Sequence, residues 1–521
     1  MNLNIAKSIN PTSGIVGVLF VSFFLQSCRS NDNVVENDVN STAQNVKISL
    51  LVSDLDEEGP AKSASVDGKK LFQEVQTSVI PLDGITSVIT TLSPKPTANL
   101  KDQTFASVNP IAGVPSPLPN GITYKVVVYD KDNGGTYVTE KDFTTGQSDP
   151  GFALTGGKTY TFVAYSLRAN SAPPTVTNGG AGSNISNAKL SAISGDLMYF
   201  KKDMTVSGNG VNNLNVILKH QFSQINTKID ARQVGIVSVN NAAITPAYTS
   251  SDLSFSTNTL TYNGQKASGE PVSFSTNNQN IVTSNTTQVI ANTAPSNNGT
   301  LTIGTLYIDK IPASNFQIPN LKINPGLQYN LNLRVSPCRQ DANLASFNKS
   351  STSNNQILGI IYTATTTSAD VGYVIDFTKL DESFTLKVNG TSVSTTEIQF
   401  SPGLPTPPGS AQNIQFTDGT RHGVNYPYIY NISGSTTNPI VRVYIQPDTQ
   451  NPGKGKISFY GVKTANGPLF PLQLYNGNSL VSFNWNANGV NNTIELSQTV
   501  ASGASSYIGS GFEKQTVTCA P

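Results

Sequence analysis

Apolar and polar residues alternate along most of this chain from residue 46 onward. Strands are expected at residues 46–52, 123–129, 158–165 and 326–335, of which the last alternates cleanly. Successive side chains of a β-strand point to opposite faces, so a period of two is typical of strands with one buried face. The dominance of this period predicts an all-β fold.

A polar segment divides the expected strands into two groups. The first group covers residues 46–337, and a Ser/Asn/Thr-rich linker is expected over 338–355. In the last group, residues 356–521, short strands follow one another with turn residues between them. This spacing favours a third β-sandwich or a jelly roll, with strands near 372–377, 384–390, 397–400, 413–416, 440–445, 456–460, 472–475, 480–485 and 493–496.

Two local features have a simple structural interpretation. Residues 130–135 suggest a calcium loop, but an EF-hand needs a ligand at its fifth position and Glu at its twelfth, where this chain has Gly134 and Lys141. An Asn-Gly-Gly stretch between two alternating runs favours a hairpin loop instead. His220 has no metal-ligand or catalytic partner near it in sequence, which favours a packed or hydrogen-bonded role at a strand turn.

The N-terminus carries an apolar run, residues 14–25, behind a polar segment. About a dozen apolar residues are too few to cross a bilayer as a helix, but they match the core of a signal peptide. We therefore expect residues 1–27 to be a signal peptide. The run ends in Leu25-Gln26-Ser27-Cys28, which resembles the lipobox of bacterial lipoproteins.

The lipobox resemblance implies cleavage before Cys28 and acylation of this residue, with palmitate among the expected chains. Several acyl chains hold a protein stably on a membrane, here the cell outer membrane, with the chain exposed at the surface. Residues 28–45 are polar and would form a tether. The alternative is an ordinary signal peptide with an incidental cysteine.

Composition refines the picture of the surface. Only 12% of the residues are charged and the formal net charge is +1, so the surface is expected to be polar but nearly uncharged. Without a positive field, nucleic-acid binding has no electrostatic support, and we expect no nucleic acid as a partner. Cys338 and Cys519 either pair as a disulfide in an oxidising compartment or remain isolated thiols.

Motifs of enzyme chemistry are mostly missing from the sequence. It contains no His-Glu-x-x-His, no Gly-x-Ser-x-Gly, no phosphate-binding Gly-x-x-x-x-Gly-Lys-Ser/Thr and no Cys-x-x-Cys. We expect no catalytic residue, no cofactor and no metal ion. A pair of carboxylates that converges only in the fold, as in glycosidases, stays open as an alternative.

The candidate recognition surface is the aromatic segment 418–431. It holds Arg421, His422, Tyr426, Tyr428 and Tyr430, a mixture suited to sugars, since rings stack on a pyranose and polar groups bind its hydroxyls. The three tyrosines share one strand parity, which is also the pattern of a buried stripe. Trp485 is a further candidate, although its spacing from Phe483 and Val481 favours a core position.

One block of sequence carries a family resemblance. A Tyr-rich strand pair, a loop, Asp-Leu-Met-Tyr at 196–199 and then an apolar strand ending Lys-His-Gln-Phe-Ser-Gln-Ile at 219–225 resemble the fimbrillin family of Bacteroidetes surface lipoproteins. The resemblance covers about residues 46–337. It implies two tandem transthyretin-like β-sandwiches, over residues 46–205 and 206–337. It also implies a lipoprotein precursor and a role in type V pili or adhesion, with other pilus subunits bound by strand exchange.

The chain departs from that family at one point. Polymerising fimbrillins resemble one another in being cut by an arginine-specific protease near the N-terminus, and here no arginine lies between Arg29 and Arg168. Two alternatives stay open: a protease cuts the chain after a lysine, or the chain stays uncut as an anchored subunit. Fimbrillin stalk subunits resemble one another in lacking a domain like that expected over 356–521, which an adhesive tip or a receptor-like lipoprotein would carry.

The sequence therefore predicts a lipid-anchored surface protein that acts as a pilus-associated subunit or adhesin, through binding of a glycan or a host surface protein. A first alternative is a surface glycan-binding lipoprotein of an uptake system. A second is a glycan-active enzyme.

Overall fold

The structure is a computed structural model that describes residues 43–50, 75–82, 86–95, 118–209, 212–291, 298–353, 357–365, 372–401, 412–486, 490–500 and 505–519. For residues 43–50 and most of 357–365 it describes the backbone alone. The apolar run 14–25, the lipobox with Cys28 and most of the expected tether lie outside these residues. Within them, no helix has the length and apolar character needed to span a bilayer.

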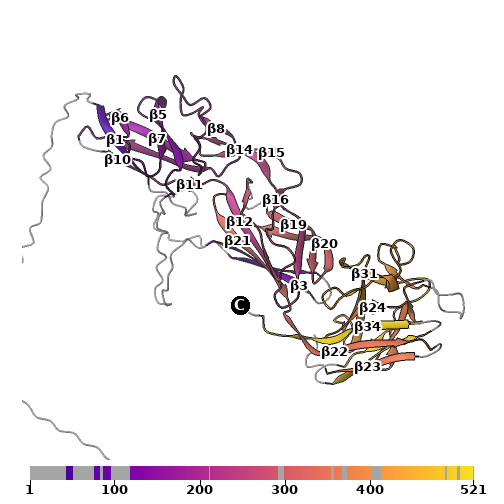
Figure 1. The fold of residues 1–521 in the computed structure, drawn as a ribbon. Helices are drawn as coiled ribbons and strands as arrows, with labels where there is room; N and C mark the ends of the chain where they lie inside the picture. Colours follow the sequence, from indigo (N-terminus) through magenta and orange to yellow (C-terminus); the bar gives the residue numbers. More distant parts are fainter. Residues whose placement is uncertain are drawn as a thin grey trace, which may run out of the picture. The chain divides into compact units, whose positions relative to one another are not determined.

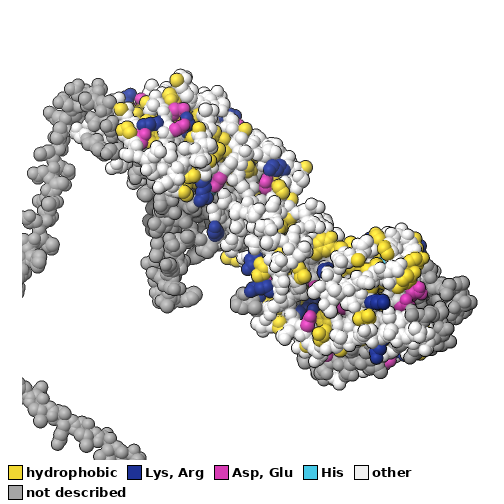
Figure 2. Space-filling model, in the orientation of Figure 1, with side chains coloured by type: hydrophobic (Ala, Val, Ile, Leu, Met, Phe, Trp, Pro, Cys, Tyr) yellow, Lys and Arg dark blue, Asp and Glu magenta, His cyan; other side chains and the backbone are white. Residues whose placement is uncertain are grey.

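The described chain is built from β-strands, which confirms the all-β prediction (Figure 1). Its one helical element is a 3-10 turn, η1 (Ile429–Asn431). Figure 2 shows a face on which Lys, Arg, Asp and Glu side chains are scattered thinly, as the charged fraction of 12% leads us to expect.

A five-stranded central sheet forms the middle layer of the first region. Its two innermost strands are buried at every residue after the first, so both of its faces are covered. One face packs on a three-stranded sheet, and together these two sheets form the first sandwich; the other face packs on a second three-stranded sheet. The central sheet has the strand order β11 (Lys219–His220), β9 (Met198–Thr205), β7 (Thr159–Ser166), β4 (Thr123–Asp130), β5 (Thr136–Thr144). The three-stranded sheet of the first sandwich has the order β10 (Asn212–Val216), β1 (Ala43–Leu50), β6 (Phe152–Thr155). The three-stranded sheet on the other face has the order β15 (Leu260–Gln265), β14 (Tyr248–Ser254), β8 (Lys189–Ile193).

Two sequence interpretations from this region agree with the structure. β4 and β5 form an antiparallel hairpin, and the loop at 130–135 is closed by the Asp130 carbonyl, which accepts the N–H of Gly135 at 2.8 Å. His220 is buried, and its Nδ1 lies 2.7 Å from Oδ1 of Asp196. Both the hairpin and the hydrogen-bonded histidine are therefore structural features.

The second sandwich pairs a large sheet with a four-stranded one. The large sheet has the order β17 (Ile281–Thr283), β12 (Ser223–Asp230), β21 (Gln328–Ser336), β3 (Ser87–Pro94), β2 (Gln76–Pro81), with β18 (Thr287–Val289) also on β12. The facing sheet has the order β16 (Glu270–Val272), β13 (Val237–Thr245), β19 (Gly299–Ile308), β20 (Ile311–Leu321). β2 and β3 precede β4 in the chain but pair inside this sandwich, so it is not the contiguous segment 206–337.

The third region is a sandwich whose first and last strands are neighbours. Its larger sheet has the order β22 (Arg339–Ser351), β34 (Ser505–Thr516), β24 (Gly372–Leu380), β29 (Val441–Pro447), β30 (Lys454–Val462), β31 (Leu469–Leu474), β28 (Ile414–Phe416), with β32 (Phe483–Asn484) on β30. The smaller sheet has the order β23 (Ile357–Thr365), β33 (Asn491–Thr499), β25 (Ser383–Val388), β26 (Thr391–Ser392), with β27 (Ile398–Gln399) on β25. We call this region the third domain.

Most of the segment expected as a linker, 338–355, is strand β22. Phe347 is its one buried residue, because the strand lies at the edge of the sheet with most side chains in solvent. A strand of that kind needs few apolar residues, which is why its sequence is hard to distinguish from a linker.

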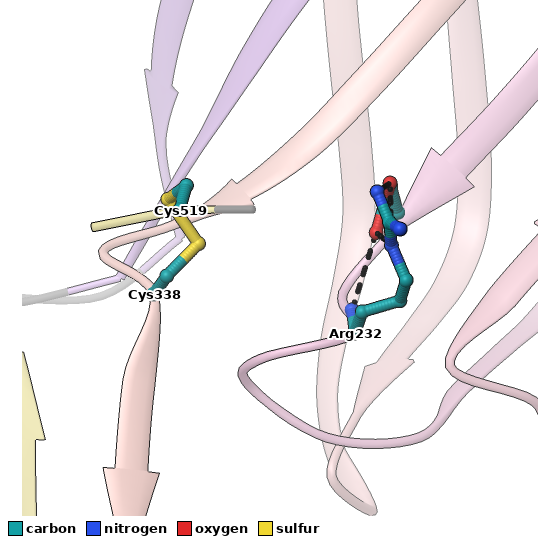
Figure 3. Close-up of a disulfide and its surroundings, with 4 residues drawn as sticks. Arg232, Cys338 and Cys519 are labelled. Atoms are coloured by element: carbon teal, nitrogen blue, oxygen red, sulfur yellow. Dashed lines mark hydrogen bonds and ion pairs between the residues drawn. A yellow bond between two sulfur atoms is a disulfide. The ribbon is translucent and has the colours of Figure 1, made fainter. Parts of the chain in front are cut away.

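A disulfide joins the two ends of the third domain. Cys338 lies directly before β22 and Cys519 follows β34, and their sulfurs are bonded (Figure 3). The Cys338 carbonyl also accepts the Val517 N–H at 2.9 Å. Arg232, drawn beside the disulfide, pairs with Asp230 at the end of β12. In the loop that follows, the Gln233 carbonyl accepts the Arg339 N–H at 2.7 Å.

Candidate functional site

The aromatic segment 418–431 forms a compact loop that starts at the end of β28. Asn425 Oδ1 accepts the Arg421 N–H at 3.0 Å, and the Arg421 carbonyl accepts the N–H groups of Asn425 and Tyr426. The Tyr426 carbonyl in turn accepts the Gly423 N–H at 2.9 Å. The segment, which the sequence indicated as a long loop that enters a strand, is therefore a loop closed on itself by short-range hydrogen bonds.

His422 anchors this loop in the core. Its ring is buried and lies 6.0 Å from the ring of Phe400 and 5.2 Å from that of Phe416, centroid to centroid. Nδ1 lies 2.9 Å from the Pro427 carbonyl, and because a carbonyl only accepts, Nδ1 carries the proton. Nε2 has no hydrogen-bond partner among the described residues. Burial lowers the pKa of His422, so the ring is neutral at pH 7.

Tyr426 belongs to a second anchor, built around Lys463. The Lys463 Nζ lies 5.1 Å from the Tyr426 ring centroid and 4.7 Å from that of Phe470, and it pairs with Asp418. Burial acts to lower the pKa of Lys463, but hydrogen bonds to Asp418 and Tyr426 outweigh it and raise that pKa. Hydrogen bonds from Lys463 and then from Thr420 lower the pKa of Asp418 to about 2. Tyr426 is thus half-buried and has a packing role.

Tyr428 and Tyr430 lie on the outside of the loop, and we call this pair the tyrosine shelf. Their rings are stacked, with centroids 5.1 Å apart and planes 12° from parallel. The side chains are 36% and 38% exposed, and Val424 in the same loop is 59% exposed. The stacked pair is therefore a partly exposed aromatic surface on the described chain.

Gly423 allows the shelf to sit close to the loop backbone. Its φ is +72°, a conformation that disfavours other residues, and a Cβ placed there would lie 2.6 Å from Cε1 of Tyr428. Any side chain at this position would displace the Tyr428 ring. The glycine is therefore required by the position of Tyr428.

Two carboxylates lie close enough to the shelf to affect its electrostatics. Desolvation, Tyr428, Glu382 and Asp381 all raise the pKa of Tyr430. Burial and the neighbouring Asp381 raise the pKa of Glu382. Asp381 Oδ2 accepts a hydrogen bond from the Ser505 hydroxyl at 2.7 Å. The turn between β24 and β25 thus supplies acceptors next to an aromatic surface.

The other sequence candidates lie elsewhere. Arg421 donates to the Tyr475 hydroxyl at 3.0 Å, with its guanidinium 5.5 Å from the centroid of that ring. Trp485 is buried in the core of the third domain, the position its spacing favoured. The structure therefore brings Tyr428 and Tyr430 together at the surface and keeps His422, Tyr426 and Trp485 in packing positions.

Sequence reasoning missed the exposed Val424 in this loop, and it missed Asp381 and Glu382 as neighbours of the shelf. Val424 stands between a glycine and an asparagine in a segment that includes a proline, a composition that indicates a loop and hence an exposed apolar residue. Asp381 and Glu382 form a tight turn between two strands, and only the fold brings that turn to the shelf.

No family model matches the chain, and no curated protein matches it. Solved structures similar to part of it include a candidate cell adhesion protein from Bacteroides fragilis NCTC 9343, 16% identical with a TM-score of 0.28 over 46% of this chain and 88% of that one. A candidate adhesin from Bacteroides thetaiotaomicron VPI-5482 is 16% identical, with a TM-score of 0.28 over 38% of this chain and 72% of its own. The fimbrial anchor protein Mfa2 from Porphyromonas gingivalis is 11% identical, with a TM-score of 0.27 over 42% and 85%. Similarity this distant says nothing of a ligand or a partner.

Proposed function

We propose that this chain is a lipid-anchored adhesin of the cell surface that binds a carbohydrate through the tyrosine shelf. The observation that supports the proposal is the exposed, stacked pair Tyr428 and Tyr430 on the third domain. A sugar presents an apolar face of C–H groups and a rim of hydroxyls. Stacked rings beside carboxylates suit both features.

The construction of the loop supports recognition by a rigid surface. The loop is fixed from below by buried His422 and by the half-buried Tyr426, so the shelf is ordered before a ligand arrives. A preformed site loses little conformational entropy on binding, which favours affinity. Asp381 and Glu382, whose charges raise the pKa of Tyr430, would accept hydrogen bonds from sugar hydroxyls.

The location follows from the N-terminal sequence. Acylation of Cys28 would hold the protein on the outer membrane, and the polar segment 28–45 would act as its tether. The shelf belongs to the region farthest along the chain from that anchor. This order suits an adhesin, in which the anchor and the binding site must lie on different parts of the molecule.

The test is a glycan array probed with the mature chain and with Tyr428→Ala, Tyr430→Ala. A stacked aromatic contact is worth about 0.5–1.5 kcal/mol beyond its buried area, so the double variant should bind at least about tenfold more weakly. Leu344→Ala is the matched control, since Leu344 is 69% exposed on β22, at the other end of the strand order from β28. Unchanged binding by the double variant would exclude the shelf as the binding site.

A second candidate function is that of a pilus-associated subunit that exchanges strands. It is favoured by β1, which comes from the N-terminal side of the chain and pairs parallel with β10 and antiparallel with β6. Removal of such a strand leaves two edges ready to accept a strand from a partner. Detergent-resistant multimers in the fraction sheared from native cells would support this function, and a single monomer band would contradict it.

A further inference from the structure

A cavity of about 250 Å³ lies where the second sandwich meets the third domain. The second sandwich contributes Thr86 and the turn between β19 and β20, and the third domain contributes Arg339 and side chains of β29 and β30. This cavity includes no residue of the tyrosine shelf. Its volume is near the lower limit of pockets for small organic ligands, a size that suits one sugar unit.

A buried ion-pair network fixes one wall of the cavity. Arg442 on β29 is buried and donates through Nε and Nη2 to the two carboxylate oxygens of Asp376, at 2.7 and 2.8 Å. Its Nη1 donates to Asp309, in the turn between β19 and β20. The Lys310 carbonyl in the same turn accepts the Leu469 N–H at 3.0 Å. The wall is therefore preformed.

The cavity carries more positive than negative charge. Lys514 pairs with Asp341, and Asp309 pairs with Arg442, so these charges are compensated. Arg339 and Lys456 also line the cavity, and neither forms an ion pair with any described residue. The Arg339 Nη2 donates to the Thr86 hydroxyl at 3.3 Å, a neutral partner that leaves its charge unbalanced.

Charged groups at the cavity also shift the pKa of their neighbours. Burial and then the charge of Arg442 lower the pKa of Lys310, against an opposite effect of Asp309. For Tyr444 burial raises the pKa most, Arg442 and Arg339 act to lower it, and Asp309 and Asp376 act to raise it, so both guanidinium groups lie close to that phenol. In a chain with 33 basic and 32 acidic residues, the surplus of Arg339 and Lys456 in one cavity is a local feature.

Aromatic and proline side chains complete the lining. The rings of Tyr444 and Tyr460 are perpendicular, with centroids 5.9 Å apart. Pro312 and Pro471 add apolar surface. An acidic ligand of purely ionic character would not use these groups. A ligand with an apolar ring face, hydroxyls and one carboxylate would use all of them.

We propose that this cavity binds an acidic sugar residue, with its carboxylate between Arg339 and Lys456 and its ring against the tyrosines. Arg339 supplies paired N–H donors that match a carboxylate, and Lys456, on the exposed rim, adds a second charge. The site is separate from the shelf and does not depend on the function assigned to it. It would give the protein a preference for glycans that carry uronic or nonulosonic acids.

The experiment is calorimetric titration of the mature chain with glucuronic acid and with N-acetylneuraminic acid, beside glucose and acetate. We expect an acidic sugar to bind at least about tenfold more tightly than glucose or acetate. Binding should weaken when NaCl rises from about 50 mM to about 500 mM, because salt screens the two cations. Tyr428→Ala with Tyr430→Ala should leave this binding unchanged, which separates the cavity from the shelf.

Variants in the cavity complete the test. Arg339→Gln with Lys456→Gln should reduce the affinity at least about tenfold, whereas Lys387→Gln, an exposed lysine on the smaller sheet, should not change it. Lys456→Gln alone should still weaken binding if the double variant is unstable, because this exposed side chain forms no ion pair with a described residue. The proposal is overturned if neither acidic sugar binds, if glucose or acetate binds equally well, or if Lys456→Gln binds as tightly as the original chain.

Discussion

The first strand and the last strand of the described chain occupy similar places and are held very differently. β1 lies between β10 and β6, and β34 lies between β22 and β24, so each is an inner strand of its sheet. β34 is also tied at its end by the disulfide from Cys338 to Cys519. No described residue ties β1 covalently to its neighbours. Of these two inner strands, β1 is held within the described chain by strand pairing, whereas β34 is also held by a covalent link.

Removal of β1 should produce the largest effect. A chain that starts at residue 51 leaves β6 and β10 without a common partner, next to a core that includes Phe152, Leu154, Leu214 and Val216. Each buried backbone group left unpaired costs about 1–3 kcal/mol, so the first sandwich should lose its cooperative thermal transition. Differential scanning calorimetry measures this loss.

The control for this deletion is a peptide of residues 43–50 added in trans. If β1 is held by pairing alone, the peptide should restore the transition in the deleted chain. A deleted chain that melts like the original would mean that β1 contributes little, and the contrast with β34 would disappear.

Loss of the disulfide should have the second largest effect, confined to the third domain. Cys338→Ser with Cys519→Ser opens a loop of 181 positions, and a disulfide typically contributes about 2–5 kcal/mol. Trp485 is the sole tryptophan and lies in the core of this domain, so its fluorescence during urea unfolding reports on the third domain.

Reductant should reproduce the effect in the original chain and have none on the double variant. An equal stability of the reduced and oxidised chains would show that the pairing of β22 with β34 alone secures the last strand.

Lowering the pH should produce the smallest of the three effects, a decrease in the stability of the third domain, which contains His422. Because burial lowers the pKa of His422, the unfolded chain binds a proton at a higher pH than the folded one. Above about pH 6.5 the ring is neutral in both states, so His422 does not change the free energy of unfolding. As the pH decreases below about 6.5, that free energy falls by up to about 1.4 kcal/mol per pH unit.

The measurement is urea unfolding followed by Trp485 fluorescence between about pH 7 and pH 5. His422→Asn keeps a donor for the Pro427 carbonyl and removes the titrating group, so the slope should flatten. Glu382, whose pKa is raised, acts in the opposite direction and is the same in both chains. A slope that stays in the variant would assign the pH dependence to another group.

Strands were predictable from the sequence wherever one face is buried. β12 and β21 alternate strictly between buried and partly exposed residues, as their sequences do. β4 shows the limit of that rule, because residues 126–129 are apolar without interruption and both faces of the strand are covered. An uninterrupted run is typical of a strand inside a layered fold, which alternation does not describe.

Pairing between distant segments was not predictable. Nothing in β3 distinguishes a partner in the first sandwich from β21, its neighbour in the second, since both would bury the same alternating face. Likewise, the parity of Tyr426, Tyr428 and Tyr430 predicted one shared face. Gly423 and Pro427 bend the backbone into a loop, so parity no longer determines direction, and Tyr426 packs inward while the shelf stays outside.

The disulfide also has a mechanical consequence. If a ligand held at the shelf is pulled away from the cell, tension enters the third domain at Cys338, where β22 begins. Without the disulfide, β22 alone would carry the tension, and this edge strand would be peeled from the sheet one hydrogen bond at a time. The covalent link to Cys519 divides the tension between β22 and β34, two chain segments of nearly equal length from the shelf. Both strands must then give way together, so the domain should withstand a pull that would unravel a reduced one.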